Sequence, residues 1–190
     1  NSKTVTYTVT GATSGGPNIE NNGGPNTPIV ADYDVTVPTI TVGQNNKVNS
    51  LTFSGGNPLT IEAGGELTVT SGTLGVQSGS SVISGGTLNT PGNLDKTGAG
   101  ELDLVSNTNV NGIANVVAGL LSVNGQLTTT GGVMVTSGAT LGGAGIIIGN
   151  VNLNNGILSP GNSPGTLTVV GNLGLTSVDT TVIEIASPTS

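Results

Sequence analysis

The strongest constraint in this sequence is a rhythm of very short strand-like segments. Successive segments in the middle of the chain start at Leu51, Leu59, Leu67, Leu74 and Val82. Each places aliphatic side chains on one face and small or polar side chains on the other, as an extended strand does. Turns rich in Gly, Asn and Ser separate the segments, and these residues tolerate positive φ. Antiparallel sandwiches usually space their strands at roughly 8–12 residues, so this tighter spacing favours a parallel solenoid.

We therefore predict an all-β fold, a right-handed single-stranded parallel β-helix (β-solenoid). Three segments would form one coil of about 21 residues, and coils stack about 4.8 Å apart. Residues 47–186 would then form about six to seven coils. Val, Leu and Ile would stack as ladders in the interior, while Thr, Ser and Asn would cover the outer faces. A β-sandwich of Gly-rich strands is the alternative.

The first quarter of the chain is less regular than the rest. Lys3–Thr10 alternates as a strand, residues 11–28 form a loop rich in Gly, Asn and Pro, and residues 33–42 contain two further strands. We predict that residues 1–46 form an N-terminal strand, loop and capping strands. Residues 47–190 are expected to form the solenoid.

The composition excludes several kinds of chemistry. The chain contains no Cys, His or Trp, only 7% of its residues are charged, and its formal net charge is −7. A thiol nucleophile, an imidazole base and a Cys or His metal site are therefore excluded. The basic residues are Lys3, Lys47 and Lys96, too few for an electrostatic footprint on nucleic acid. We expect no cofactor.

No apolar run approaches the roughly 18 residues of a membrane span, and we expect any export signal to be already removed or never present.

Two stretches in the second half of the chain carry a family likeness. From residue 98 the sequence reads GAGELDL, then Asn107-Thr108, then GLLSVNG; from residue 138 it reads GATLGGAG, then GNV, then LSPGNSPGTLTV. These stretches resemble the passenger-associated repeat of bacterial autotransporters, and the likeness covers about residues 48–185. The Tyr that usually follows Asn-Thr in this repeat is absent, since Asn109 stands there.

The resemblance implies a parallel β-helix passenger of type V secretion, secreted or displayed on the outer membrane exterior of a Gram-negative-type bacterium. The absence of Cys suits this export route, because no disulfide can lock the chain before passage. The family is functionally broad, and a fold likeness alone assigns no activity.

The acidic residues are the only candidates for catalysis. Glu101 and Asp103 lie at i and i+2 beside Leu102 and Leu104, which are expected to point inward. The two acids would then share an outward face about 7 Å apart, a separation compatible with a glycosidase carboxylate pair. Solvated charges that keep a solenoid face soluble are the other interpretation. We favour that one and expect no enzymatic activity, with a carbohydrate-active or carbohydrate-binding β-helix as the alternative.

A second acidic pair, Asp32 and Asp34, precedes the first regular coil. Its carboxylates, together with loop carbonyls from residues 21–26, could hold one calcium ion through oxygen ligands. The sequence leaves this question open, and we assign no metal ligands.

The ends of a solenoid present unpaired strand edges, which must be capped, covered or paired. Two strand-like segments near the termini are candidates for such pairing. Their candidate assembly residues are Thr4, Val5, Tyr7, Val9, Val182, Ile183 and Ile185. We predict a homo-oligomer or polymer formed through the solenoid ends. The expected function is an extracellular structural protein, either a stalk, an adhesin scaffold or a fibre subunit, with a host or surface glycan or protein as a further partner.

Overall fold

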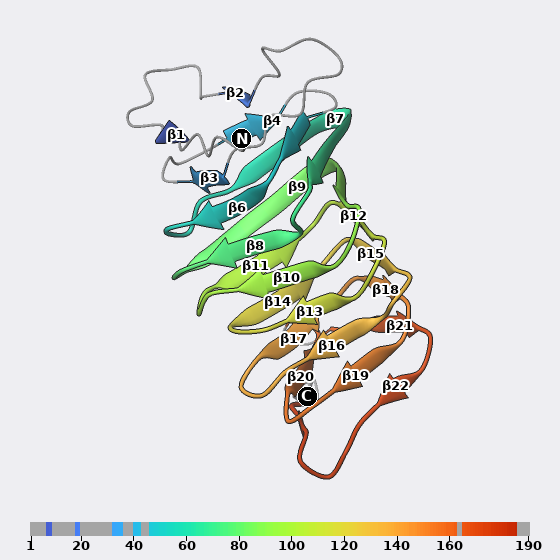
Figure 1. The fold of residues 1–190 in the computed structure, drawn as a ribbon. Helices are drawn as coiled ribbons and strands as arrows, with labels where there is room; N and C mark the ends of the chain where they lie inside the picture. The colour runs from blue at the N-terminus through green and yellow to red at the C-terminus, as the bar shows by residue number, and fades with distance from the viewer. Residues whose placement is uncertain are drawn as a thin grey trace, which may run out of the picture.

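The computed structural model describes residues 7–8, 18–19, 32–35, 40–42, 46–162 and 165–185. In this part of the chain every regular element is a β-strand and there is no helix. The strands form about seven coils of a parallel solenoid, stacked in chain order from one end of the molecule to the other (Figure 1). The predicted fold class is therefore confirmed.

Each complete coil of the described part contributes one strand segment to each of three faces, and the strands at the two ends of the stack belong to the first and second faces. The first face contains β1 (Tyr7–Thr8), β3 (Asp32–Val35), β6 (Ser50–Phe53), β8 (Thr73–Val76), β10 (Leu94–Thr97), β13 (Ala114–Val116), β16 (Val133–Val135), β19 (Val151–Leu153) and β22 (Leu173–Gly174). The second face contains β2 (Asn18–Ile19), β4 (Ile40–Val42), the first part of β7 (Leu59–Val69), the first part of β9 (Ser80–Thr90), β11 (Glu101–Leu104), β14 (Leu120–Val123), β17 (Thr140–Gly143), β20 (Ile157–Pro160) and β23 (Thr180–Thr181).

The third face contains β5 (Asn46–Val48), the second parts of β7 and β9, β12 (Asn107–Val110), β15 (Gln126–Thr129), β18 (Ile146–Ile148) and β21 (Thr168–Val170). The long strands β7 and β9 bend from the second face onto the third, and this joins the two faces into one sheet. The coil that begins with β10 continues through β11 and β12. It is followed by β13, which pairs back onto β10 in parallel register.

Aliphatic side chains fill the interior because each short strand alternates between inward and outward positions. On the second face, Leu102, Leu121 and Leu141 lie in register on consecutive coils and are all buried. On the third face, Leu67 and Leu88 lie in register on consecutive coils and are buried. Leu127 is also buried but lies two coils after Leu88, with Thr108 in register between them. Burying one such side chain stabilises the fold by about 1.5–3 kcal/mol. The predicted ladders are confirmed.

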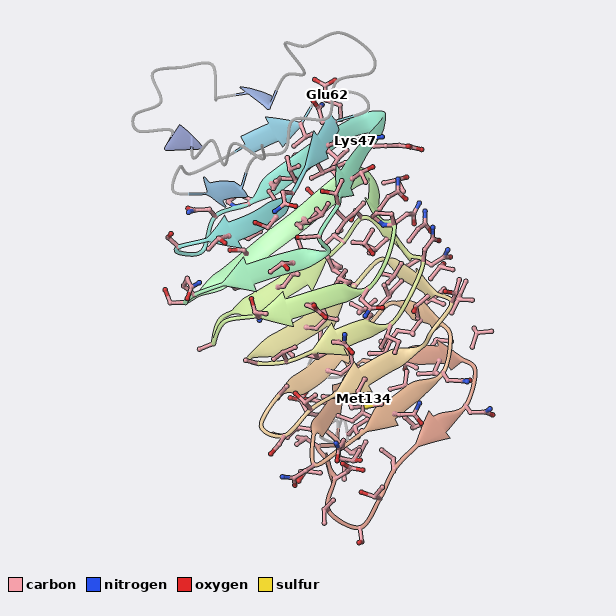
Figure 2. All side chains as sticks on the ribbon, viewed as in Figure 1. Lys47, Glu62 and Met134 are labelled. Atoms are coloured by element: carbon pink, nitrogen blue, oxygen red, sulfur yellow. The ribbon has the colours of Figure 1, made fainter. Side chains whose placement is uncertain are left out.

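Outward positions carry mainly small or polar side chains. On the first face, Asp95, Asn115, Met134 and Asn152 follow one another in register. Asn115 donates a hydrogen bond from Nδ2 to Asp95 Oδ1 at 2.6 Å. Figure 2 shows these outward side chains along the stack, with Met134 labelled on β16 and with Lys47 and Glu62 labelled nearer the N-terminal end. Rows of hydrogen-bonding groups therefore run along the outside of the solenoid.

Glycine is required where the chain bends between faces. Gly85, in the bend of β9, has φ +85°, and a Cβ on it would collide with the carbonyl oxygen of Ile61 in the previous coil. Gly98 has φ +77°, and a Cβ there would collide with the Val76 carbonyl oxygen. At these corners the backbone of one coil lies directly against the backbone of the next.

The last coil in the described part lacks a covering layer. Leu173 lies in register with Val151, which is buried, yet Leu173 is 45% exposed. Leu175, Val182 and Ile183 are also exposed. Inward positions of this coil are open because no further coil of the described part lies on them.

The described strands of the N-terminal region continue the same stacks. β3 pairs in parallel with β6, and β4 pairs in parallel with β7. The predicted division at residue 46 stays a prediction. Within the described residues, no helix is long and apolar enough to cross a membrane.

Candidate functional site

The acidic pair Glu101 and Asp103 lies on the outer side of the second face. Leu102 and Leu104 of the same strand, β11, are buried in the interior. Glu101 precedes Leu102, and Asp103 lies between the two leucines. Both acids therefore point outward, and both are half-buried. In register on the adjacent coils, Asp103 lies between Val82 and Ser122. This placement agrees with the outward face expected from the alternation.

Asn124 fixes the surroundings of Asp103. Its Nδ2 group donates to Asp103 Oδ1 at 2.7 Å and to Ser122 Oγ at 3.2 Å. Its Oδ1 atom accepts from the Ala144 backbone N–H at 2.9 Å and from Asn162 Nδ2 at 2.8 Å. An amide has two donor hydrogens and two acceptor lone pairs, so all four are used. The Asn124 amide is therefore held in one orientation, and it orients the Asp103 carboxylate.

The surroundings of Asp103 raise the pKa of its carboxyl above the ordinary value. Burial raises the pKa of Asp103, the Asn124 hydrogen bond acts in the opposite direction, and the negative charge of Glu101 adds to the rise. A carboxyl with a raised pKa beside a second carboxyl is the arrangement that general-acid catalysis uses. On the next coil the equivalent positions are Leu120 and Ser122, and on the coil after that they are Thr140 and Gly142. The polar side chains at these positions are therefore Ser122 and Thr140, interrupted by Leu120 and Gly142.

The other predicted residues are only partly within the described structure. Asp32 and Asp34 belong to β3, where their backbones pair with Ser50 and Thr52; their side chains and the loop at residues 21–26 lie outside the described structure. Among the described residues, no group of three or more acidic side chains is arranged to hold a metal ion.

Some of the candidate assembly residues lie within the described structure and others lie outside it. Tyr7 lies in β1, where its backbone pairs with that of Tyr33. Val182, Ile183 and Ile185 follow β23 and are exposed, Ile185 by 90%. The predicted residues Thr4, Val5 and Val9 lie outside the described residues.

Lys96 is the residue whose position the sequence analysis missed. Its side chain is 0% exposed and takes an inward position of β10, two residues after the buried Leu94. Nζ donates to the carbonyl oxygens of Thr97 at 3.0 Å, Gly98 at 3.0 Å and Ala118 at 2.9 Å. The alternation of inward and outward residues along β10, which starts with the inward Leu94, indicates that the side chain of Lys96 also points inward.

The Lys96 ammonium group is fully hydrogen-bonded. It has three donor hydrogens, and three carbonyl oxygens accept them. Burial lowers the pKa of Lys96 to about 8, so the charged form still predominates at neutral pH. Thr97 is the last residue of β10 and Gly98 begins the corner after it, while Ala118 belongs to the equivalent corner one coil later. Lys96 therefore connects two successive coils.

The fold and these sites define a parallel β-solenoid with hydrogen-bonded outer faces and a charged group in its interior. No known protein-family model matches the chain, and no curated protein or solved structure shows significant similarity to it.

Proposed function

We propose that this chain is a non-enzymatic structural protein, a rigid solenoid that serves as a stalk, adhesin scaffold or fibre subunit. The observation that carries the proposal is the unbroken parallel pairing of the first face, which runs from β1 through every coil to β22. An interior of stacked aliphatic rows and an outer surface of short polar side chains suit an extended spacer. The outer faces would also present the surface on which a host or surface glycan or protein binds.

The proposed location is outside the cell, at the bacterial surface. Support comes from the resemblance of residues 98–169 to autotransporter passenger repeats. A chain without Cys also folds without disulfide formation, which suits export in an unfolded state. Localisation of an epitope-tagged chain, with and without protease added to intact cells, tests this part of the proposal.

Self-assembly through the solenoid ends is part of the proposed function. β21, β22 and β23 are the last strands of their stacks in the described part, and each presents an outer edge. Such edges pair readily with added strands. Leu173 and Ile183 add exposed apolar surface at this end.

Negative-stain imaging at rising protein concentration tests the assembly. We expect rods that lengthen with concentration, and we expect Leu173→Asp and Ile183→Asp to shorten them. Val105→Asp is the matched control, because Val105 is as exposed as Leu173 but lies in a middle coil. Rods of constant length at every concentration would contradict self-assembly and leave the stalk as the proposed function.

A carbohydrate-active or carbohydrate-binding solenoid is the second candidate function. The raised pKa of Asp103 beside Glu101 favours it. The test is release of reducing sugar from a panel of polysaccharides, compared between the unaltered chain and Glu101→Gln or Asp103→Asn. Release that these substitutions abolish and Glu66→Gln preserves would establish it; binding without release would indicate a lectin-like face.

A further inference from the structure

One coil of the solenoid contains an unusual set of buried polar side chains. Lys96 on β10, Ser106 between β11 and β12, and Thr108 on β12 all belong to it, and each is buried. In register with Thr108, the preceding coil has Leu88 and the following coil has Leu127. Thr108 therefore interrupts a row that is aliphatic on both sides.

Ser106 and Thr108 point into the interior together. They are separated by Asn107, which is exposed on the outer side. Ser106 lies in the bend just before β12, and residues two apart along a chain have Cα atoms at most about 7 Å apart. The two hydroxyl groups therefore belong to the same layer of the core.

Neither hydroxyl has a hydrogen-bond partner in the described part of the chain. Ser106 Oγ and Thr108 Oγ1 are both fully buried and without a protein partner. Other buried hydroxyls in the solenoid are bonded: Thr129 Oγ1, for example, donates to Gly112 O at 2.6 Å. Buried polar groups in folded proteins nearly always have a partner, either protein or ordered water.

We propose that Ser106 and Thr108 form an internal hydration site that holds a water molecule between their hydroxyl oxygens. A water at about 2.8 Å from each oxygen spans up to about 5.6 Å, which suits two hydroxyls on alternate residues. Threonine has one heavy atom fewer than the leucines above and below it, so its side chain fills less of the interior at this level than a leucine would. A water in liquid takes a share of about 30 Å³.

The chemistry of the site selects water over an ion. Each hydroxyl both donates and accepts a hydrogen bond, as water does. An anion would need positive charge nearby, but the three N–H donors of Lys96 are held by carbonyl oxygens at the corner between the first and second faces. A cation would need a carboxylate, but Asp95, Glu101 and Asp103 of this coil occupy outward positions.

A crystal structure of the full chain, at a resolution that places ordered waters, tests the proposal. We expect a density peak within hydrogen-bond distance of both Ser106 Oγ and Thr108 Oγ1. Thr108→Val, which preserves the side-chain shape, should remove the peak. Thr97→Val should preserve it, because Thr97 is on the outer side of the same coil.

Three crystallographic results would overturn the proposal. The first is the absence of any peak in the unaltered chain, and the second is a peak that persists in Thr108→Val. The third is an anomalous bromide signal at this position in crystals grown with bromide, which would assign the site to an anion. In solution, magnetisation transfer from a long-lived water to the Thr108 methyl group is the expected NMR signature, and its absence would also count against the site.

Discussion

Lys96 lies in register with Leu74 of the preceding coil and with Val116 of the following coil. Both neighbours are fully buried. The methylene stem of the lysine therefore continues an aliphatic row, while its ammonium group turns to the corner and binds three carbonyl oxygens. A charge is accommodated inside the solenoid because a long side chain joins an apolar position to a cluster of acceptors.

The first prediction concerns the hydrogen bonds of Lys96. Lys96→Met preserves the length of the apolar stem but leaves three carbonyl oxygens without their donor. Hydrogen bonds to a charged group are stronger than neutral ones, but removal of the buried charge offsets part of their loss. We expect the free energy of unfolding to fall by about 1–3 kcal/mol, measured by denaturant unfolding at neutral pH.

Lys47→Met is the control for this substitution, because Lys47 is exposed on β5. We expect it to change the free energy of unfolding by less than about 0.5 kcal/mol. A Lys96→Met variant as stable as the unaltered chain would show that the carbonyl bonds only balance the cost of burying the charge.

The second prediction is a rise in stability at alkaline pH. Burial lowers the pKa of Lys96 from 10.5 to about 8. Between these values the unfolded chain binds a proton that the folded chain has released, so the free energy of unfolding increases with pH. The whole shift corresponds to about 3 kcal/mol. Below about pH 8 both states are protonated and this group makes no pH-dependent contribution.

Denaturant unfolding from about pH 7.5 to about pH 9.5 measures this effect in the unaltered chain and in Lys96→Met. The difference between the two curves isolates Lys96 from the two tyrosines of the chain. Parallel curves would show that the carbonyl oxygens hold the pKa of Lys96 near its ordinary value.

The coils could be predicted from the sequence because their alternation is local. Leu102 and Leu104 identify the inward side of β11, and Glu101 and Asp103 follow as outward residues. Residues 146–148 form a strand whose inward side cannot be predicted from alternation. All three are isoleucine, so no polar residue marks a side; register with the buried Leu127 places Ile147 inside and leaves its neighbours exposed. Register between coils depends on every preceding corner, not on the segment itself.

The contacts of the candidate site are harder to predict for the same reason. Asn124 follows Asp103 by one coil, whereas Asn162 reaches Asn124 from 38 residues further along the chain. Lys96 presents a different difficulty, since charged side chains are almost never fully buried unless paired. The alternation after Leu94 marks position 96 as inward, but the corner carbonyl oxygens are what satisfy a buried ammonium group, and their convergence is a property of the stacked coils.

The third prediction concerns the glycines at the bends. Gly85 and Gly64 both have positive φ, but only at Gly85 would a Cβ collide with the backbone of the previous coil. Gly64→Ala should therefore cost about 1–2 kcal/mol, from backbone conformation alone. Gly85→Ala should cost about 4 kcal/mol or more, or prevent folding. Thermal and denaturant unfolding of both variants provide the comparison, and equal losses would show that the coils can separate at this corner.

The fourth prediction concerns the acidic pair on the second face. Glu101 raises the pKa of Asp103 and the Asn124 hydrogen bond lowers it. Glu101→Gln should therefore lower the pKa of Asp103, whereas Asn124→Ala should raise it. Carbon-detected NMR titration of the Asp103 carboxyl measures both changes. Glu66→Gln, on an earlier coil, should leave the titration unaltered, and an unchanged pKa in Glu101→Gln would mean that the two carboxylates do not interact.

The last prediction concerns the connection between the final two described coils. Asp179 Oδ2 accepts from the Thr176 backbone N–H at 2.6 Å and from Thr176 Oγ1 at 2.9 Å, and its Oδ1 accepts from the Gly156 N–H at 3.2 Å. Desolvation acts to raise the pKa of Asp179, but the donors of Thr176, Gly156 and Asn155 outweigh it and hold the pKa below its ordinary value. The ionised carboxylate thus ties the last turn to the coil before it.

Because the folded pKa of Asp179 is lowered, its contribution to stability is present above the ordinary pKa of 3.8 and is lost as the pH falls through the folded value. At neutral pH, Asp179→Ala should accelerate hydrogen exchange at the Gly156, Thr176 and Thr180 amides, while exchange in the middle coils stays unchanged. Glu184→Gln, which removes another acidic charge from the same end, should have no such effect. If the two substitutions accelerate exchange equally, charge at this end of the solenoid governs its opening, and the hydrogen bonds of Asp179 do not.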